Sequence, residues 1–127
     1  MFSHATIGTN DLARAAAFYD AVLAPLGIER VPSKYQHWAA WRRPGETETL
    51  WVGRPFNGQM ANPGNGCMTA FAAPSRTAVD SAYAAAIAAG GVDEGAPGLR
   101  ASYAPDYYGA YVRDLDGNKL HFVRRGQ

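Results

Sequence analysis

An internal repeat constrains the fold of this chain more than any other feature. The segment FSHATIGTNDLARAAAFYDAVLAPLG, residues 2–27, aligns without gaps with GCMTAFAAPSRTAVDSAYAAAIAAGG, residues 66–91. Each copy reads as a short alternating strand, a capping residue, an amphipathic helix and a glycine. Because one such unit is too small to cover its own sheet, the repeat predicts two modules that pack together in one fold.

The helix in each copy has start and stop signals. Asp11 and Ser75 are predicted N-caps, because their side chains can accept hydrogen bonds from the free amides of a first helical turn. Each helix is expected to end at a glycine, which supplies the left-handed conformation common at helix ends. Apolar residues recur every three or four positions and predict the buried stripes Leu12, Ala16, Tyr19, Leu23, Leu26 and Val79, Tyr83, Ala86, Ile87.

Three short strand-like runs follow each helix. They cover about 28–32, 37–42 and 48–53 in the first half, and 92–94, 108–114 and 119–123 in the second. The LDGN segment between the last two predicts a hairpin turn. These runs predict an α+β domain over 1–127, with one module at about 1–53, a linker at about 54–66 and a second module at about 67–127. The segment 95–106 contains two prolines and is predicted to form a loop over a cavity mouth.

Charge and cysteine content exclude several classes of protein. The formal net charge is +1, with 12 basic and 11 acidic residues scattered along the chain. A nucleic-acid interface would need a clustered basic face, so none is expected. No run is long and apolar enough to cross a membrane, and no basic segment followed by an apolar run suggests a signal peptide. The single cysteine, Cys67, allows no disulfide within the chain, so we expect a cytoplasmic protein.

Two segments carry a resemblance to a known family. HATIGTNDLARAAAFYDAVLAPLG and YYGAYVRDLDGNKLHFV look like the opening and closing signatures of the vicinal oxygen chelate superfamily. That superfamily includes glyoxalase I, fosfomycin and bleomycin resistance proteins, and extradiol dioxygenases. The resemblance covers nearly the whole chain and implies paired βαβββ modules that form an incomplete barrel. It also implies a small-molecule ligand in the concave side and pairing into a homodimer.

The resemblance further implies a metal site, because metal-dependent members take ligands from the first and last strand of each module. The matching positions in this sequence are His4, Trp51, Met68 and His121. His4 and His121 are therefore candidate ligands of one divalent metal such as zinc, nickel, iron or manganese, or candidate catalytic groups that carry a proton. Typical members have a glutamate at the final position. A chain without metal, whose histidines only line a wall, is the alternative.

Aromatic residues predict a ligand pocket. Tyrosines cluster in ASYAPDYYGAY, and Arg100 just before them is a candidate partner for an anionic substrate group. A pocket or a dimer interface accounts for such tyrosines equally well. Trp51 and Met68 would make the same pocket dry and suited to a planar ligand. The full set of predicted pocket residues is Trp51, Met68, Arg100, Tyr103, Tyr107, Tyr108 and Tyr111.

Two functions from different classes follow. The first is an enzyme of lyase, isomerase or dioxygenase type that acts on a small molecule, or a degenerate relative of one with an incomplete metal site. The second is a protein that binds and sequesters an aromatic compound or drug without a metal. Glutathione-hemithioacetal isomerisation, the best-known reaction of the superfamily, is not expected, because the acidic ligands that also act as bases are absent.

Overall fold

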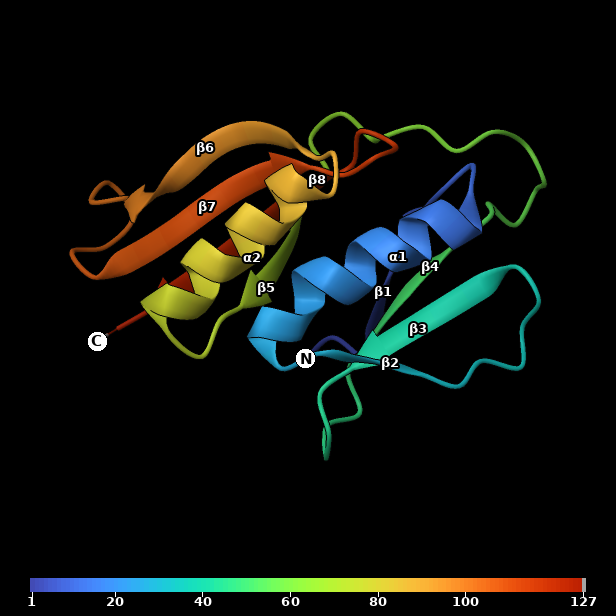
Figure 1. Ribbon diagram of the computed structural model, residues 1–127, viewed down its shortest axis with the longest axis horizontal. Helices are drawn as coiled ribbons and strands as arrows, with labels where there is room; N and C mark the ends of the chain where they lie inside the picture. Colours follow the sequence, from blue (N-terminus) through green and yellow to red (C-terminus); the bar gives the residue numbers. More distant parts are fainter. Residues whose placement is uncertain (127) are drawn as a thin grey trace.

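The computed structural model describes residues 1–126 and contains two copies of one plan (Figure 1). Each half has a strand, a helix and three further strands, as the repeat predicts. The first half comprises β1 (His4–Gly8), α1 (Leu12–Leu23), a short 3-10 helix (Ala24–Leu26), β2 (Glu29–Val31), β3 (Trp38–Arg42) and β4 (Thr49–Gly53). The second comprises β5 (Thr69–Ala72), α2 (Arg76–Ala88), β6 (Val92–Leu99), β7 (Tyr107–Arg113) and β8 (Lys119–Arg125).

Each half forms its own four-stranded mixed sheet. The strand orders are β1-β4-β3-β2 and β5-β8-β7-β6, so the same topology occurs twice. In each sheet the first strand pairs parallel to the last strand of its module, and the remaining pairs are antiparallel. We call the two sheets the first and the second sheet. They do not close into a barrel, and this α+β arrangement agrees with the predicted fold class.

Local signals in the sequence explain both helices. The Asp11 side chain accepts from the Arg14 amide at 3.1 Å, and the Ser75 side chain accepts from the Ala78 amide at 3.0 Å, so both predicted caps are confirmed. After α1 the backbone continues as the 3-10 helix Ala24–Leu26, because Pro25 has no amide hydrogen to continue the α-helical hydrogen bonds. Neither helix within residues 1–126 is long and apolar enough to cross a membrane.

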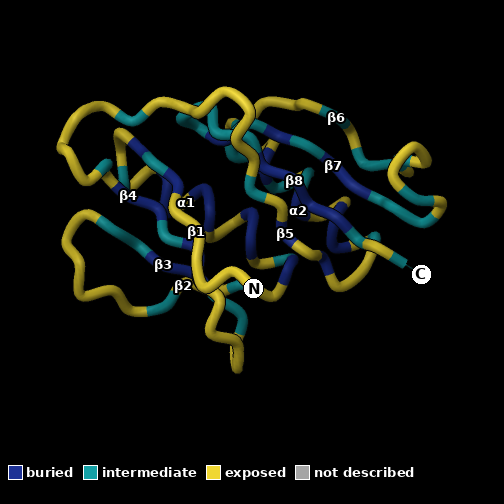
Figure 2. Tube along the Cα trace, turned by 180° about the vertical axis from the view of Figure 1, so that it is seen from behind, coloured by how far each residue is buried: buried dark blue, intermediate teal, exposed yellow. Residues whose placement is uncertain are grey.

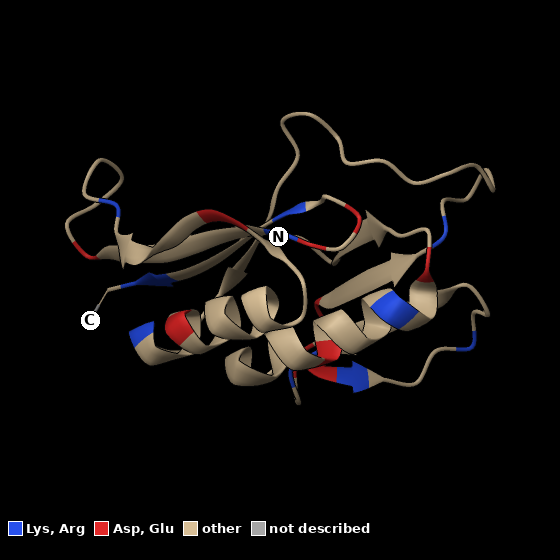
Figure 3. Ribbon diagram, turned by 45° about the horizontal axis from the view of Figure 1, so that its top comes forward, with Lys and Arg blue, Asp and Glu red and all other residues tan. Residues whose placement is uncertain are grey.

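The helices lie against each other and against one face of both sheets (Figures 1 and 3). Buried residues follow this shared layer, while the linker and most loops are exposed (Figure 2). Trp41 marks the helix-facing side of the first sheet, since its ring contacts Tyr19 of α1 at 5.7 Å. Trp38 faces the other side, as its spacing from Trp41 predicts. We call the side away from the helices the outer face.

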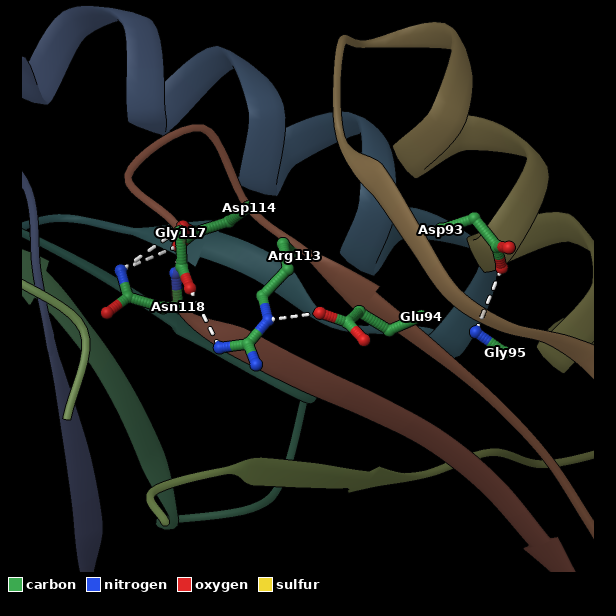
Figure 4. A network of polar contacts seen from close by, with 7 residues as sticks. All are labelled: Asp93, Glu94, Gly95, Arg113, Asp114, Gly117 and Asn118. Atoms are coloured by element: carbon green, nitrogen blue, oxygen red, sulfur yellow. Dashed lines mark hydrogen bonds and ion pairs between the residues drawn. The ribbon is translucent and has the colours of Figure 1, made fainter. Parts of the chain in front are cut away.

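A polar clamp joins the second module to the first at the turn between β7 and β8. The buried Asp114 carboxylate accepts a hydrogen bond from the Tyr19 hydroxyl of α1. It also accepts from the backbone and side-chain amides of Asn118 (Figure 4). Asp116 accepts from the Thr9 hydroxyl at 2.6 Å. Gly117 takes the left-handed conformation that the predicted Asp-Gly turn needs, with φ 88°. This pair of aspartates therefore fixes how the modules sit together.

The region after α2 departs from the prediction of a short strand at 92–94 and a loop at 95–106. Strand β6 runs from Val92 to Leu99, and its pairing with β7 shifts register on both sides of Gly95. These irregularities interrupt the regular alternation by which a strand is recognised in sequence. Only the segment from Arg100 to Asp106 connects β6 to β7, so the predicted covering loop is shorter than expected.

Candidate functional site

Three aromatic rings form a stack on the outer face of the second sheet. Tyr107, Gly109 and Tyr111 occupy alternate positions of β7, and His121 of β8 pairs in register with Tyr111. The His121 ring lies parallel to Tyr111, with centroids 4.0 Å apart, and to Tyr107, with centroids 5.7 Å apart. Space for it exists because Gly109 has no side chain: a Cβ there would lie 2.5 Å from Cε1 of His121. We call Tyr107, His121 and Tyr111 the aromatic stack.

Both ring nitrogens of His121 are engaged within the protein. Nδ1 lies 2.9 Å from the carbonyl oxygen of Ala110, which can only accept, so Nδ1 carries the hydrogen. Nε2 lies 2.7 Å from the Tyr107 hydroxyl and accepts from it. Burial lowers the pKa of His121, and the Ala110 hydrogen bond opposes that shift only in part. A neutral, fully buried imidazole with both nitrogens bonded has no lone pair left for a metal.

Positive charges surround the aromatic stack. The Arg100 guanidinium carbon lies 5.5 Å from the centre of the Tyr111 ring, and Nζ of Lys119 lies 5.3 Å from the same centre. The Arg125 guanidinium carbon lies 5.7 Å from the centre of the Tyr107 ring. Such contacts with aromatic rings are favourable. The three cations therefore flank the two outer rings of the stack.

Tyr103 extends this surface from the loop after β6. Its ring meets Tyr107 edge to face with centroids 5.1 Å apart, and it is itself well exposed. Partial burial raises the pKa of the Tyr111 hydroxyl, and a hydrogen bond with Tyr103 raises it further. The predicted residues Arg100, Tyr103, Tyr107, Tyr111 and His121 are thus brought together on one face.

The remaining predicted residues lie elsewhere. His4 is exposed on β1 and hydrogen-bonds the neighbouring Ser3. It lines a cleft of about 510 Å³ between the edges of β1 and β5, as does Met68. Trp51 is half-buried on the outer face of the first sheet, where its ring contacts Tyr35 with centroids 5.7 Å apart. None of the aromatic stack lines that cleft.

Tyr108 belongs to the opposite side of the second sheet from the pocket predicted for it. Its hydroxyl donates to the Asp80 carboxylate of α2 at 2.6 Å, and Arg76 of the same helix lies over its ring. The reason is the alternation of a strand, which turns consecutive side chains to opposite faces. Adjacent tyrosines in YYGAY therefore cannot share one pocket wall, and Tyr108 instead helps to hold α2.

The residues present do not fit a divalent metal. Of the four positions that the resemblance implies, Trp51 has no donor atom for a metal and Met68 offers a soft thioether. His121 has both nitrogens engaged, which leaves His4 as the one imidazole accessible at those positions. Within residues 1–126 no three His, Cys, Asp or Glu side chains gather closely enough to hold an ion. The donor set of these four positions therefore supports no chemical step through a metal.

Sequence reasoning missed four residues that shape this face. Gly109 makes room for His121, Ala110 orients its ring, and Lys119 and Arg125 supply two of the three cations. The alternation of Tyr, Gly and Tyr at 107, 109 and 111, with a basic residue on either side of His121 at 119 and 125, was the available signal. Strand alternation puts each of these sets on one face.

Comparison with known proteins agrees with this architecture. The sequence profile of the Glyoxalase/Bleomycin resistance protein/Dioxygenase superfamily matches residues 1–122. The chain belongs to this superfamily. A search of curated proteins gave no match.

Solved structures of the superfamily resemble the chain over almost its full length. A glyoxalase/bleomycin resistance protein from Albidiferax ferrireducens is 43% identical, with a TM-score of 0.87 and coverage of 99% of each chain. A glyoxalase-related enzyme from Fulvimarina pelagi is 20% identical, with a TM-score of 0.74 and coverage of 98% of this chain and 88% of its own. A lactoylglutathione lyase from Agrobacterium tumefaciens is 20% identical, with a TM-score of 0.66, covering 98% of this chain and 92% of its own. The last two likenesses bear on the fold alone.

Proposed function

We propose that this member of the superfamily binds a small aromatic molecule without a metal, on the outer face of its second sheet. The observation that carries the proposal is the state of His121. The position that the resemblance assigns to a metal ligand is instead the middle ring of the aromatic stack, with both nitrogens bonded to protein groups. Of the alternatives for His121, this geometry supports a wall residue that orients the Tyr107 hydroxyl.

The same geometry weighs against the enzymatic hypothesis as a metal-dependent lyase, isomerase or dioxygenase. A catalytic site for a divalent ion usually has three protein ligands and one open position. Here His4 and His121 stand on different sheets, and His121 cannot turn toward a metal without losing two hydrogen bonds and its place between two rings. Of the enzymatic hypotheses, a degenerate relative with an incomplete metal site therefore agrees best with the proposal of metal-free binding.

Elemental mass spectrometry tests the metal-free part of the proposal. The protein is purified without a histidine tag or chelator and incubated with zinc, nickel, ferrous iron or manganese. We expect far less than one metal per chain after desalting, both in the wild type and in His4→Ala and His121→Ala. A near-stoichiometric metal in the wild type that is lost in both variants would contradict the proposal and restore the metalloenzyme hypothesis.

A ligand screen tests the binding part. Neutral and charged aromatic compounds are screened by proton NMR, with the ring resonances of the tyrosines as the readout. We expect bound compounds to lose affinity in Tyr103→Ala, whose exposed side chain is 66% accessible and borders the aromatic stack. Tyr35→Ala is the matched control, since Tyr35 is 52% accessible and lies on the first module. The opposite pattern would place binding on the first sheet and refute the proposed site.

A homodimer and a cytoplasmic location are part of the same proposal. Exposed apolar side chains on the linker and the second module, Phe56, Met60 and Leu99 among them, support a partner surface. Cys67 is an exposed free thiol, which suits a reducing compartment. Sedimentation velocity across a concentration series measures the oligomeric state, and a monomer at all concentrations would remove the dimer from the proposal.

A further inference from the structure

The proposed function leaves open what kind of aromatic molecule is bound, and the charges around the aromatic stack address this. We propose that the ligand is an aromatic acid, whose oxyanion is held by Arg100 and Lys119 beside Tyr111, while Arg125 adds positive charge at the Tyr107 end of the stack. This inference rests on the proposed function and narrows it to one ligand class. It is carried by two cations against the Tyr111 ring, a third against the Tyr107 ring, and the lack, among the described residues, of a carboxylate paired with them.

Two of the cations lie against Tyr111, at one end of the aromatic stack, and the third lies against Tyr107, at the other end. Arg100 and Lys119 come from different strand ends, yet both lie within 5.5 Å of the centre of the Tyr111 ring. Arg125, at the far end of β8, lies over Tyr107. All three charges also act on His121, the middle ring, where each disfavours the protonated imidazole and helps to lower its pKa. Two segments, the residue after β6 and the two ends of β8, thus direct positive charge to the outer face.

No carboxylate of the described chain neutralises this charge. The ion pairs within residues 1–126 join Arg30 to Asp20, Arg43 to Glu46 and Arg113 to Glu94. Arg113 also lies on the outer face of β7, and, unlike the three cations, it is paired with a carboxylate of the described chain. Its guanidinium donates to Glu94 at 2.7 Å and to the Gly117 carbonyl at 3.1 Å (Figure 4).

The surroundings of the three cations differ from those of Arg113. Arg100 donates to the Ala96 carbonyl at 2.8 Å, which fixes its guanidinium without cancelling its charge. Basic segments lie in the loop after β6 and at the end of β8, near the C-terminus, with one acidic segment on that loop (Figure 3). That acidic residue is Asp106, and among residues 1–126 it forms no ion pair with any of the three cations.

Hydrogen bonding decides which groups can receive an oxyanion. The Tyr107 hydroxyl already donates to His121, so it can accept a hydrogen bond from a ligand but not donate one. Tyr111 and Tyr103 are hydrogen-bonded to each other. One hydroxyl of that pair keeps a free hydrogen, but the charged donors are those of the cations, and guanidinium groups match the geometry of a carboxylate or sulfonate. The tyrosine rings remain available for contact with the aromatic part of the ligand.

A matched pair of ligands separates charge from aromatic contact. Naphthoate and naphthamide have the same ring system and nearly the same size, and only naphthoate carries an oxyanion. Their affinities are measured by calorimetry in the wild type and in Arg100→Gln, Lys119→Gln and Arg125→Gln. Arg76→Gln is the control, because Arg76 also lies over a tyrosine ring, that of Tyr108, but on the helix side of the sheet.

We expect naphthoate to bind about tenfold more tightly than naphthamide at low ionic strength, and the difference to shrink as salt is added. Arg100→Gln and Lys119→Gln should each weaken naphthoate by roughly two- to fivefold, the range of partly exposed charge pairs, and Arg125→Gln should weaken it less. All three should change naphthamide little. Arg76→Gln should change neither. Thermal unfolding of each variant checks that the fold is intact.

Each other outcome overturns a defined part of the reasoning. Equal affinity for the two compounds, with both weakened in Tyr103→Ala, would leave the proposed function standing and remove the acid. Tighter naphthoate binding that none of the three substitutions affects would place the oxyanion elsewhere and also remove this inference. If neither naphthoate nor naphthamide binds at millimolar concentration, and no compound of the aromatic screen binds, the proposed function is refuted together with this inference.

Discussion

Replacing Gly109 by alanine places a methyl group where the His121 ring lies. The added Cβ would stand 2.5 Å from Cε1 and 3.3 Å from Nε2 of His121, and 3.2 Å from the carbonyl oxygen of Phe122. The ring cannot retreat easily, because Tyr111 lies parallel to it at 4.0 Å and both nitrogens are hydrogen-bonded. Overpacking of this kind costs about 1–3 kcal/mol. A lost hydrogen bond adds about 1 kcal/mol.

The free energy of unfolding should therefore fall by about 2–4 kcal/mol in Gly109→Ala, measured by urea denaturation followed by circular dichroism. The double variant with His121→Ala removes the obstacle. In that background only the contact with the Phe122 carbonyl oxygen at 3.2 Å remains, so the alanine should cost less than about 1 kcal/mol. The two substitutions should thus be coupled by about 1 kcal/mol or more.

Gly98→Ala serves as the control for this cycle. Gly98 pairs in register with Gly109, but its added Cβ would meet only the flexible end of Arg100, with Nη1 at 3.2 Å. We expect a change of less than about 1 kcal/mol there. A small effect of Gly109→Ala, or additive effects in the double variant, would show that the His121 ring does not fill the space above Gly109.

Three further predictions concern stability. Burial lowers the folded-state pKa of His121 below its unfolded value of about 6.5, so its contribution is complete above that pH and is lost as pH falls toward the folded pKa. The loss of unfolding free energy is at most about 1.4 kcal/mol per pH unit, and it should be absent in His121→Phe. Urea midpoints measured against pH for the wild type and this variant check it, and parallel pH profiles would contradict it. Tyr19→Phe, which removes the hydrogen bond to the buried Asp114, should cost about 1.5–3 kcal/mol in chemical denaturation, and Tyr83→Phe, whose hydrogen bond to Asp93 is exposed, far less. Asp116→Ala should break two hydrogen bonds to the first module and increase amide exchange at the start of α1, while unchanged exchange would refute the clamp.

Much of the fold was predictable because its signals are local. The caps Asp11 and Ser75 act on amides three residues ahead, and the Asp-Gly turn acts within its own hairpin. The start of β6 was predicted at 92–94, but residues 95–99 were placed in a loop, because the pairing with β7 is irregular and the sequence lacks the alternation of a regular strand. Tyr108 was grouped with its neighbours by composition, although strand geometry turns it to α2.

The sequence by itself determined the repeat, the two modules, the helix ends and the family, because periodicity, capping and turn chemistry act over a few residues. Only the tertiary structure decided the state of His121. Its partners Ala110 and Tyr107 belong to the neighbouring strand, and the register of β7 against β8 sets which atoms meet its nitrogens. The gathering of Arg100, Lys119 and Arg125 has the same origin, since charges from separate segments act together only where the sheet brings them to one face.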